Sequence, residues 1–190
     1  MTAPAAAKRP ATVLAVSGSL RAASSNTNLL RAAALVAPPY ITVSLFAGLG
    51  SLPLFNPDLD HEDEPLPSVE EWRALLRTAD AVLISTPEYA HGVPGALKNA
   101  LDWVVGSGEL VGKPVGLVNA FPRSTHAQAS LVETLTVMSA VLPPDAVVAV
   151  PPECKRLDPK GMASAPEIAG PFQQALDALV RVRDACCPNR

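Results

Sequence analysis

Short apolar runs alternate along this chain with longer segments of helical periodicity. The runs at residues 12–17 and 81–85 are apolar almost throughout, which predicts strands buried on both faces of a sheet. The run at 41–46 alternates more and predicts a strand nearer an edge. Two further runs, at 115–120 and 146–150, bring the predicted strands to five.

Helical spacing of apolar residues separates these strands, and we expect helices at 27–36, 68–78, 96–105, 128–141 and 168–185. Ser68 is followed three residues later by Glu71, the order of a capping box, so we expect the Ser68 hydroxyl to cap its helix. Five strands alternating with five helices predict a doubly wound open α/β sheet. Such sheets bind ligands beyond the carboxyl ends of their strands, which directs attention to the loops at 17–28, 86–95 and 119–127.

Length and composition restrict the possible classes of protein. With 190 residues, of which 48% are hydrophobic, we expect residues 1–10 to be a flexible tail and residues 11–187 to form one domain. A formal net charge of -3 gives no electrostatic reason to expect nucleic acid. No apolar run approaches the roughly 20 residues that span a membrane, and the first residues lack the apolar core of a secretory signal. We therefore expect a cytoplasmic protein, and its three cysteines show no metal-ligand spacing.

The segment SGSLRAASSN, at residues 17–26, lies where the first strand ends and the first helix begins. Free N–H groups and the helix dipole favour an anion at such a place. Arg21 adds a fork of donors suited to phosphate oxygens, and Gly18 permits close backbone approach. Neither GxxxxGK[ST] nor GxGxxG follows the strand, so the loop suits a terminal phosphomonoester. The alternative is that its hydroxyl and amide groups only cap the helix while Arg21 is solvated.

The segment TPEYAHGVPGALKNALDW follows the third predicted strand. Pro87 fixes one backbone angle, Gly92 allows a positive φ, and Pro94 suits the first turn of the next helix. We expect a rigid loop whose N–H groups bond the edge of a flat heteroaromatic ring, with Tyr89 and His91 lining that ring or a stacked substrate. The alternative is that Tyr89 packs and His91 faces solvent.

These two segments, in this order and each after a predicted strand, resemble the NADPH-dependent FMN reductase family. The resemblance covers most of the chain, including FAGLGSLPLFNPDL. It implies a flavodoxin-like fold, with a doubly wound five-stranded parallel sheet in the order 2-1-3-4-5 and helices on both faces. It also implies FMN as cofactor, NADPH or NADH as electron donor, and a small-molecule electron acceptor. A homodimer or homotetramer is implied too, with helices beginning near Pro94 and Gln128 at the interface.

The resemblance assigns cofactor contacts in three loops. The first loop supplies the phosphate contacts, Ser19, Arg21, Ser24, Ser25 and Asn26, with Ser17 beside them. The second loop borders the isoalloxazine through Pro87, Glu88, Tyr89, Ala90, His91 and Gly92. The third loop adds Asn119 and Ser124.

The chain departs from the family pattern in two places. Many relatives read PEYNHS where this chain reads PEYAHG, so Ala90 and Gly92 cannot supply polar side-chain contacts, although backbone contacts remain. The third loop, NAFPRSTHAQ, lacks the glycine-rich run of many relatives. Its Ser124, Thr125 and His126 either approach the pyrimidine side of the flavin or cap the following helix.

The implied function is that of an NAD(P)H-dependent oxidoreductase. A hydride passes from NAD(P)H to flavin N5, and the reduced flavin then reduces flavin, quinone, azo or similar acceptors in a ping-pong scheme. No side chain is expected to act as an acid or base, and no metal site is expected. The alternatives are a flavodoxin-type electron carrier, which a weakly acidic chain fits less well, and a flavin-free ligand-binding module on the same fold.

Overall fold

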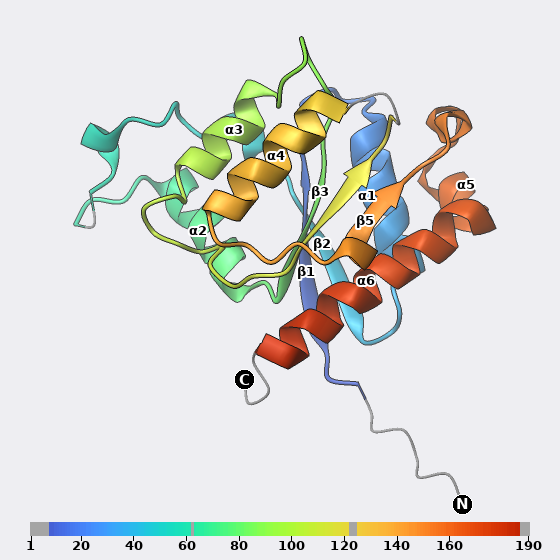
Figure 1. Cartoon of the computed structure of the whole chain (residues 1–190). Coiled ribbons are helices and arrows are strands. Elements are labelled where there is room, and N and C mark those ends of the chain that lie inside the picture. The colour runs from blue at the N-terminus through green and yellow to red at the C-terminus, as the bar shows by residue number, and fades with distance from the viewer. Residues whose placement is uncertain (1–7, 62, 122–124, 187–190) are drawn as a thin grey trace, which may run out of the picture.

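The computed structural model describes residues 8–61, 63–121 and 125–186, and its centre is a five-stranded sheet (Figure 1). The strands are β1 (Ala11–Ser17), β2 (Ile41–Phe46), β3 (Ala81–Ser85), β4 (Val115–Asn119) and β5 (Val147–Ala149). All neighbouring strands run parallel, in the order β2-β1-β3-β4-β5. The predicted class, strand order and strand positions are confirmed, with boundaries that differ by one residue.

Helices cover both faces of this sheet (Figure 1). One face packs against α1 (Ser25–Val36), α5 (Pro159–Ser164) and α6 (Pro166–Cys186). The other packs against α2 (Pro67–Thr78), α3 (Gly95–Asp102) and α4 (Thr125–Val137). The central strand β1 serves both layers, because Val13 and Ala15 join the first apolar cluster while Leu14 and Val16 join the second. This is why its sequence is apolar at successive positions.

Several helix bounds differ from the sequence prediction: α3 ends at Asp102 rather than 105, α4 begins at Thr125 rather than 128, and α5 was not predicted. The capping box at Ser68 is wrong: Pro67 occupies the first turn of α2, Leu66 is the N-cap residue, and no side chain caps the helix. The helix α4 ends at Val137 rather than 141, because Ser139 adopts a φ of 59° and turns the chain away. A left-handed residue after a helix is usually glycine, so the sequence carried no signal for this end.

The ends of β1 and β3 approach each other closely. The N–H of Gly18 donates to the carbonyl of Ser85 at 2.8 Å, which extends the pairing beyond β1. A Cβ on Gly18 would lie 2.3 Å from Oγ1 and 2.9 Å from Cβ of Thr86, distances that real Cβ atoms do not reach. The close approach expected of Gly18 is therefore present, and its partner is the neighbouring loop.

The chain before β1 is attached to α6. Lys8 Nζ donates to Tyr40 Oη at 2.5 Å and lies 3.2 Å from Asp177 Oδ1, while Tyr40 Oη donates to the same carboxylate. These hydrogen bonds, led by that to Tyr40, raise the pKa of Lys8 above 10.5. Burial and the bond to Asp177 raise the pKa of Tyr40 above 10.0. The boundaries proposed for the tail and for the single domain, 1–10 and 11–187, stay predictions.

We predict that Gly18→Ala lowers the free energy of unfolding by about 1–3 kcal/mol, since Thr86 must be displaced. Urea denaturation followed by circular dichroism measures the change. Thr86→Ala in the same chain removes the nearest atom and should recover part of the loss. The matched control is Gly95→Ala, because no atom lies within 4 Å of a Cβ at that position. A Gly18→Ala variant as stable as the control contradicts the close approach.

We predict that Lys8→Met destabilises the protein near neutral pH and has little effect in strongly alkaline buffer. Because both pKa values are raised on folding, the contribution of these residues to the free energy of unfolding is complete below about pH 10. It is lost as the pH rises through the pKa values of the folded state. Urea denaturation at several pH values measures the difference from the unmodified protein. The control is Lys160→Met at an exposed position of α5. Its difference in stability from the unmodified protein should not decrease as the pH rises. A difference independent of pH contradicts the prediction.

Candidate functional site

A pocket of ≈ 230 Å³ lies at the carboxyl edge of the sheet, between the loops that follow β1, β3 and β4. Eight of the fourteen predicted site residues line it together: Ser19, Arg21, Ser24, Ser25, Asn26, Pro87, Glu88 and Tyr89. Three lining residues were missed, namely Thr86, Ala120 and Phe121. Thr86 directly follows β3 and Ala120 directly follows β4, so their place at strand ends was an available signal.

The remaining predicted residues lie around this pocket rather than in its lining. Ser17 lies beneath the first loop, and the turn containing Ala90, His91 and Gly92 extends beyond the lining. Asn119 lines a smaller neighbouring hollow, with Gln128. Ser124 falls outside the described residues.

Hydrogen bonds to the hydroxyl groups of Ser17 and Ser24 fix the conformation of the first loop. Ser17 Oγ accepts hydrogen bonds from Ser19 N at 3.3 Å and from Thr27 Oγ1 at 2.9 Å. Ser24 is the N-cap of α1, and its Oγ accepts from Thr27 N at 3.3 Å. The alternative interpretation of this loop, that its hydroxyl groups cap the helix, is therefore correct for Ser24. Ser17 shapes the loop through hydrogen bonds and does not line the pocket.

Several donors at the N-terminus of α1 have no acceptor among the described residues. Asn26 is buried and its Oδ1 accepts from Ser85 Oγ at 2.9 Å, but its Nδ2 makes no hydrogen bond there. The backbone N–H groups of Ser25 and Asn26 are also unbonded within the described chain. Arg21 is exposed and pairs with no described carboxylate. Because these residues line one pocket and the positive end of the helix dipole adds to them, the pocket fits an anionic group.

The second loop contains a tight turn from Tyr89 to Gly92. Tyr89 N donates to Gly92 O at 3.1 Å, and Gly92 N donates to Tyr89 O at 2.9 Å. The central residues, Ala90 and His91, have φ values of 49° and 60°. Our expectation that Gly92 supplies the positive φ is therefore wrong. Two residues with side chains hold the left-handed conformation instead, as the middle positions of this kind of turn require.

Contacts with α4 hold this loop in place. Glu88 Oε2 accepts a hydrogen bond from the backbone N–H of Ala127 at 2.8 Å, so a carboxylate from the second loop caps α4. The rings of His91 and His126 stack with centroids 4.2 Å apart and an angle of 20° between their planes. Asn119 Nδ2 donates to Gln128 Oε1 at 2.6 Å, which ties the end of β4 to the same helix. The third loop thus supports the second, and His126 reaches His91.

Among the described residues, no group of three or more His, Cys, Asp or Glu side chains lies close enough together to hold a metal ion. In the part of the chain that the structure describes, no helix combines the length and apolar character needed to cross a membrane.

Comparisons with known proteins identify the family and the fold. Residues 11–153 match the family model described as NADPH-dependent FMN reductase. An NAD(P)H-dependent FMN reductase of Pseudomonas aeruginosa is 38% identical over 131 residues, which cover 66% of this chain and 70% of that protein. A quinone reductase of Escherichia coli K12 is 38% identical over 105 residues, 54% of this chain and 56% of its own. The matched segment thus spans only about half of that quinone reductase.

A solved structure extends the likeness over nearly the whole chain. FerB, a flavoenzyme NAD(P)H:(acceptor) oxidoreductase from Paracoccus denitrificans, superposes with a TM-score of 0.71 at 28% identity. The superposition covers 92% of this chain and 98% of FerB, and it confirms the flavodoxin-like fold. The family match also confirms the predicted class of enzyme, an NAD(P)H-dependent flavin reductase. The chain belongs to the NADPH-dependent FMN reductase family.

Proposed function

We propose that this protein binds FMN in the pocket at the carboxyl edge of the sheet and uses NAD(P)H to reduce a small acceptor such as a quinone. The observation that carries the proposal is the set of unbonded donors around the N-terminus of α1. They match a phosphate group in charge and in number of hydrogen bonds. The names of the Pseudomonas and Escherichia relatives support the choice of donor and acceptor.

The phosphate would be held by Arg21, Ser25 and Asn26, with Ser19 and Ser24 closing the same wall of the pocket. Among the described lining residues, Arg21 supplies the only cationic side chain, and the backbone N–H groups of Ser25 and Asn26 supply fixed dipoles. Asn26 is positioned by its bond to Ser85 before any ligand arrives. A site whose donors are already placed loses little conformational entropy on binding.

The isoalloxazine would lie against the second loop. The N–H groups of Ala90 and His91 make no hydrogen bond with described residues, because the turn uses only those of Tyr89 and Gly92. They remain available to the edge of a heteroaromatic ring. Tyr89 is 54% exposed and lines the pocket, where it can cover a ring face. Glu88 also lines the pocket, while its carboxylate accepts the hydrogen bond from Ala127 and orients the loop.

When bound, FMN supplies the redox chemistry, accepting two electrons from a reduced nicotinamide and passing them to the acceptor. The residues of the chain bind and orient the groups, and none needs to transfer a proton in the transfer from the nicotinamide. Donors on the second loop would stabilise negative charge that develops on the ring. The site therefore acts mainly through binding and preorganisation.

We also propose a homodimer or homotetramer in which α3 and α4 contribute to the interface, and a cytoplasmic location. Exposed valines on α4 support the interface, since Val132 is 37% and Val137 is 74% exposed. A closed oligomer would bury such side chains.

The purified protein, mixed with FMN and desalted, should stay yellow and lose that colour when NADPH or NADH is added without oxygen. The expected result follows from a pocket that holds the phosphate and leaves a ring face open to a nicotinamide. Absorbance spectra during titration with each nucleotide measure it. Retained FMN that neither nucleotide reduces would instead indicate an electron carrier. No retained flavin, together with no NAD(P)H oxidation in excess FMN, would indicate a flavin-free module.

We predict that Arg21→Gln weakens FMN binding by about tenfold or more, because a charged hydrogen bond to phosphate is lost. Quenching of flavin fluorescence measures the Kd. Riboflavin, which has no phosphate, should bind the variant and the unmodified protein alike. The control is Arg31→Gln on the exposed side of α1, where the guanidinium bonds only Asn28. An equal loss for riboflavin, or unchanged FMN affinity, contradicts the assignment.

A further inference from the structure

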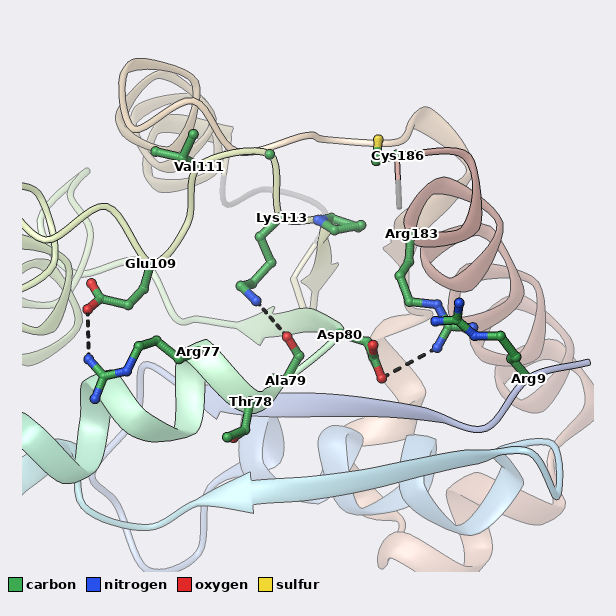
Figure 2. A pocket seen from close by; sticks show the side chains of 12 residues that line it. Arg9, Arg77, Thr78, Ala79, Asp80, Glu109, Val111, Lys113, Arg183 and Cys186 are labelled. Atoms are coloured by element: carbon green, nitrogen blue, oxygen red, sulfur yellow. Dashed lines mark hydrogen bonds and ion pairs between the residues drawn. The ribbon is translucent and has the colours of Figure 1, made fainter. Parts of the chain in front are cut away.

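A second and larger hollow lies at the opposite edge of the sheet, where the strands begin (Figure 2). Its volume is ≈ 450 Å³, within the range of roughly 300–1,000 Å³ typical of small-molecule sites. The walls come from the segments that precede β1, β3 and β4 and from the last turns of α2 and α6. No residue of the FMN pocket takes part.

Cationic side chains outnumber acidic ones in this lining. Arg9, Arg77, Lys113 and Arg183 face two carboxylates, those of Asp80 and Glu109, although the whole chain is formally negative. Two more carboxylates pair with this set from outside the lining: Glu70 with Arg77, and Asp184 with Arg183. Whether the hollow favours an anion or a cation therefore depends on which of these donors and acceptors lack hydrogen-bond partners.

The acidic groups of the lining are already engaged. Glu109, only 3% exposed at its side chain, lies 3.3 Å from Arg77 and accepts from Ser107 Oγ at 2.5 Å. Asp80 Oδ2 accepts from Thr12 N at 2.7 Å and from Thr12 Oγ1 at 3.1 Å, and it lies 3.4 Å from Arg183 (Figure 2). A ligand cation would have to compete with these bonds.

Two of the cations are engaged by the helix end beside them. Lys113 Nζ donates to the carbonyl of Ala79, the C-cap residue of α2, at 2.5 Å (Figure 2). Arg77 lies in the last turn of α2 and pairs with Glu70 and Glu109. Carbonyls at a helix C-terminus attract cations, so these two side chains have a structural role without any ligand.

Arg183 is buried and incompletely bonded. The residue is 4% exposed, with Nε donating to Asp184 at 2.9 Å and Nη1 donating to the carbonyl of Pro10 at 2.9 Å. Its Nη2 lies 2.8 Å from Asp184 Oδ1, but this contact lacks hydrogen-bond geometry, and Nη2 has no hydrogen bond within the described chain. A buried N–H group without an acceptor costs free energy, and an acceptor from a ligand would remove that cost.

Arg9 has no hydrogen-bond or ion-pair partner among the described residues, yet the backbone on both sides of it is fixed. Lys8 contacts Tyr40 and Asp177, and the carbonyl of Pro10 accepts from Arg183. The N–H of Ala11 donates to Tyr40 O at 2.8 Å. Arg9 belongs to no helix and, unlike Lys113 and Arg77, makes no hydrogen bond or ion pair with a helix end among the described residues. Its guanidinium lines the hollow and donates to no described residue, which leaves its five N–H groups for a ligand.

We propose that this hollow binds a small ligand through a phosphate or carboxylate group, with Arg9 and Arg183 as the principal contacts. Guanidinium groups match planar and tetrahedral oxyanions through paired hydrogen bonds. The volume exceeds what a simple ion fills, so the ligand carries further atoms beside Val111 and Thr78. The site lies away from the FMN pocket, and the proposal does not depend on the function proposed for that pocket.

Isothermal titration calorimetry of the full chain, with inorganic phosphate, pyrophosphate and citrate at constant ionic strength, tests the proposal. The protein is saturated with FMN so that the other anion-binding pocket is filled. We expect at least one probe to bind, and Arg9→Gln to weaken that binding by about tenfold. Comparison of the phosphate probes with citrate shows which oxyanion is preferred. Arg9→Gln should fold normally, since the side chain has no described partner.

Two further variants distinguish the possible outcomes. Arg181→Gln removes the same charge from α6 at a position 63% exposed, where the guanidinium pairs only with Asp145. Arg21→Gln disables the FMN pocket, so it is titrated without FMN. Binding lost in Arg9→Gln and kept in both of these variants supports the proposal. It is overturned if no probe binds, if Arg9→Gln and Arg181→Gln weaken binding equally, or if only Arg21→Gln abolishes it.

Discussion

The pocket at the carboxyl edge depends on one close contact, the approach of Gly18 to Thr86 where β1 and β3 end. The hydrogen bond from Gly18 N to Ser85 O, 2.8 Å long, continues the pairing of the two strands into their loops. Since no Cβ fits at Gly18, the loop after β1 can lie directly against the loop after β3. Ser85 then reaches Asn26 at 2.9 Å and connects the end of β3 to the first turn of α1. Two loops separated by about 60 residues thereby form one wall, so the unbonded donors of α1 and the turn after β3 are placed relative to each other by the sheet itself.

The turn beyond this wall is held in an unfavourable conformation by its neighbours. Positive φ values at Ala90 and His91 each cost free energy, because neither residue is glycine. Such conformations persist where surrounding contacts maintain them, and here α4 provides those contacts through Glu88 and through the stacked ring of His126. The consequence is a turn with two N–H groups that the protein itself does not use. The positive φ values of Ala90 and His91 therefore cost free energy and also leave the N–H groups of these two residues unbonded. Such a turn is suited to hydrogen bonding a ligand through its backbone.

Sequence patterns predicted the parts of this molecule that local chemistry determines. Uniformly apolar strands such as β3 predicted burial on both faces, and the residues after β1 and β3 were predicted to lie together, as they do around one pocket. Strand order came from the family resemblance, because periodicity carries no information about which strands are neighbours. Conformations set by distant contacts were missed. Gly92 looked suited to a positive φ, but the hydrogen bonds of the turn place that φ at Ala90 and His91. Phe121 was missed although it lies in the loop at 119–127, because an aromatic residue beside a strand end is as typical of packing as of a ligand contact.

The two edges of the sheet differ electrostatically because every strand runs in the same direction. Helices that return the chain begin near the carboxyl edge and end near the amino edge, so free N–H groups gather at one and free carbonyls at the other. The first edge uses this polarity directly, since the N–H groups of Ser25 and Asn26 line the pocket there. At the second edge, Lys113 donates a hydrogen bond to the carbonyl of Ala79. Part of the cationic lining is therefore explained by the carbonyl groups at the helix ends. Arg9 belongs to no helix, and its backbone is fixed because the carbonyl of the next residue, Pro10, accepts a hydrogen bond from Arg183. Helix polarity therefore accounts for cations at this edge in general, Arg183 in the last turn of α6 included, and the proposed ligand site rests on Arg9 and on the incomplete hydrogen bonding of Arg183.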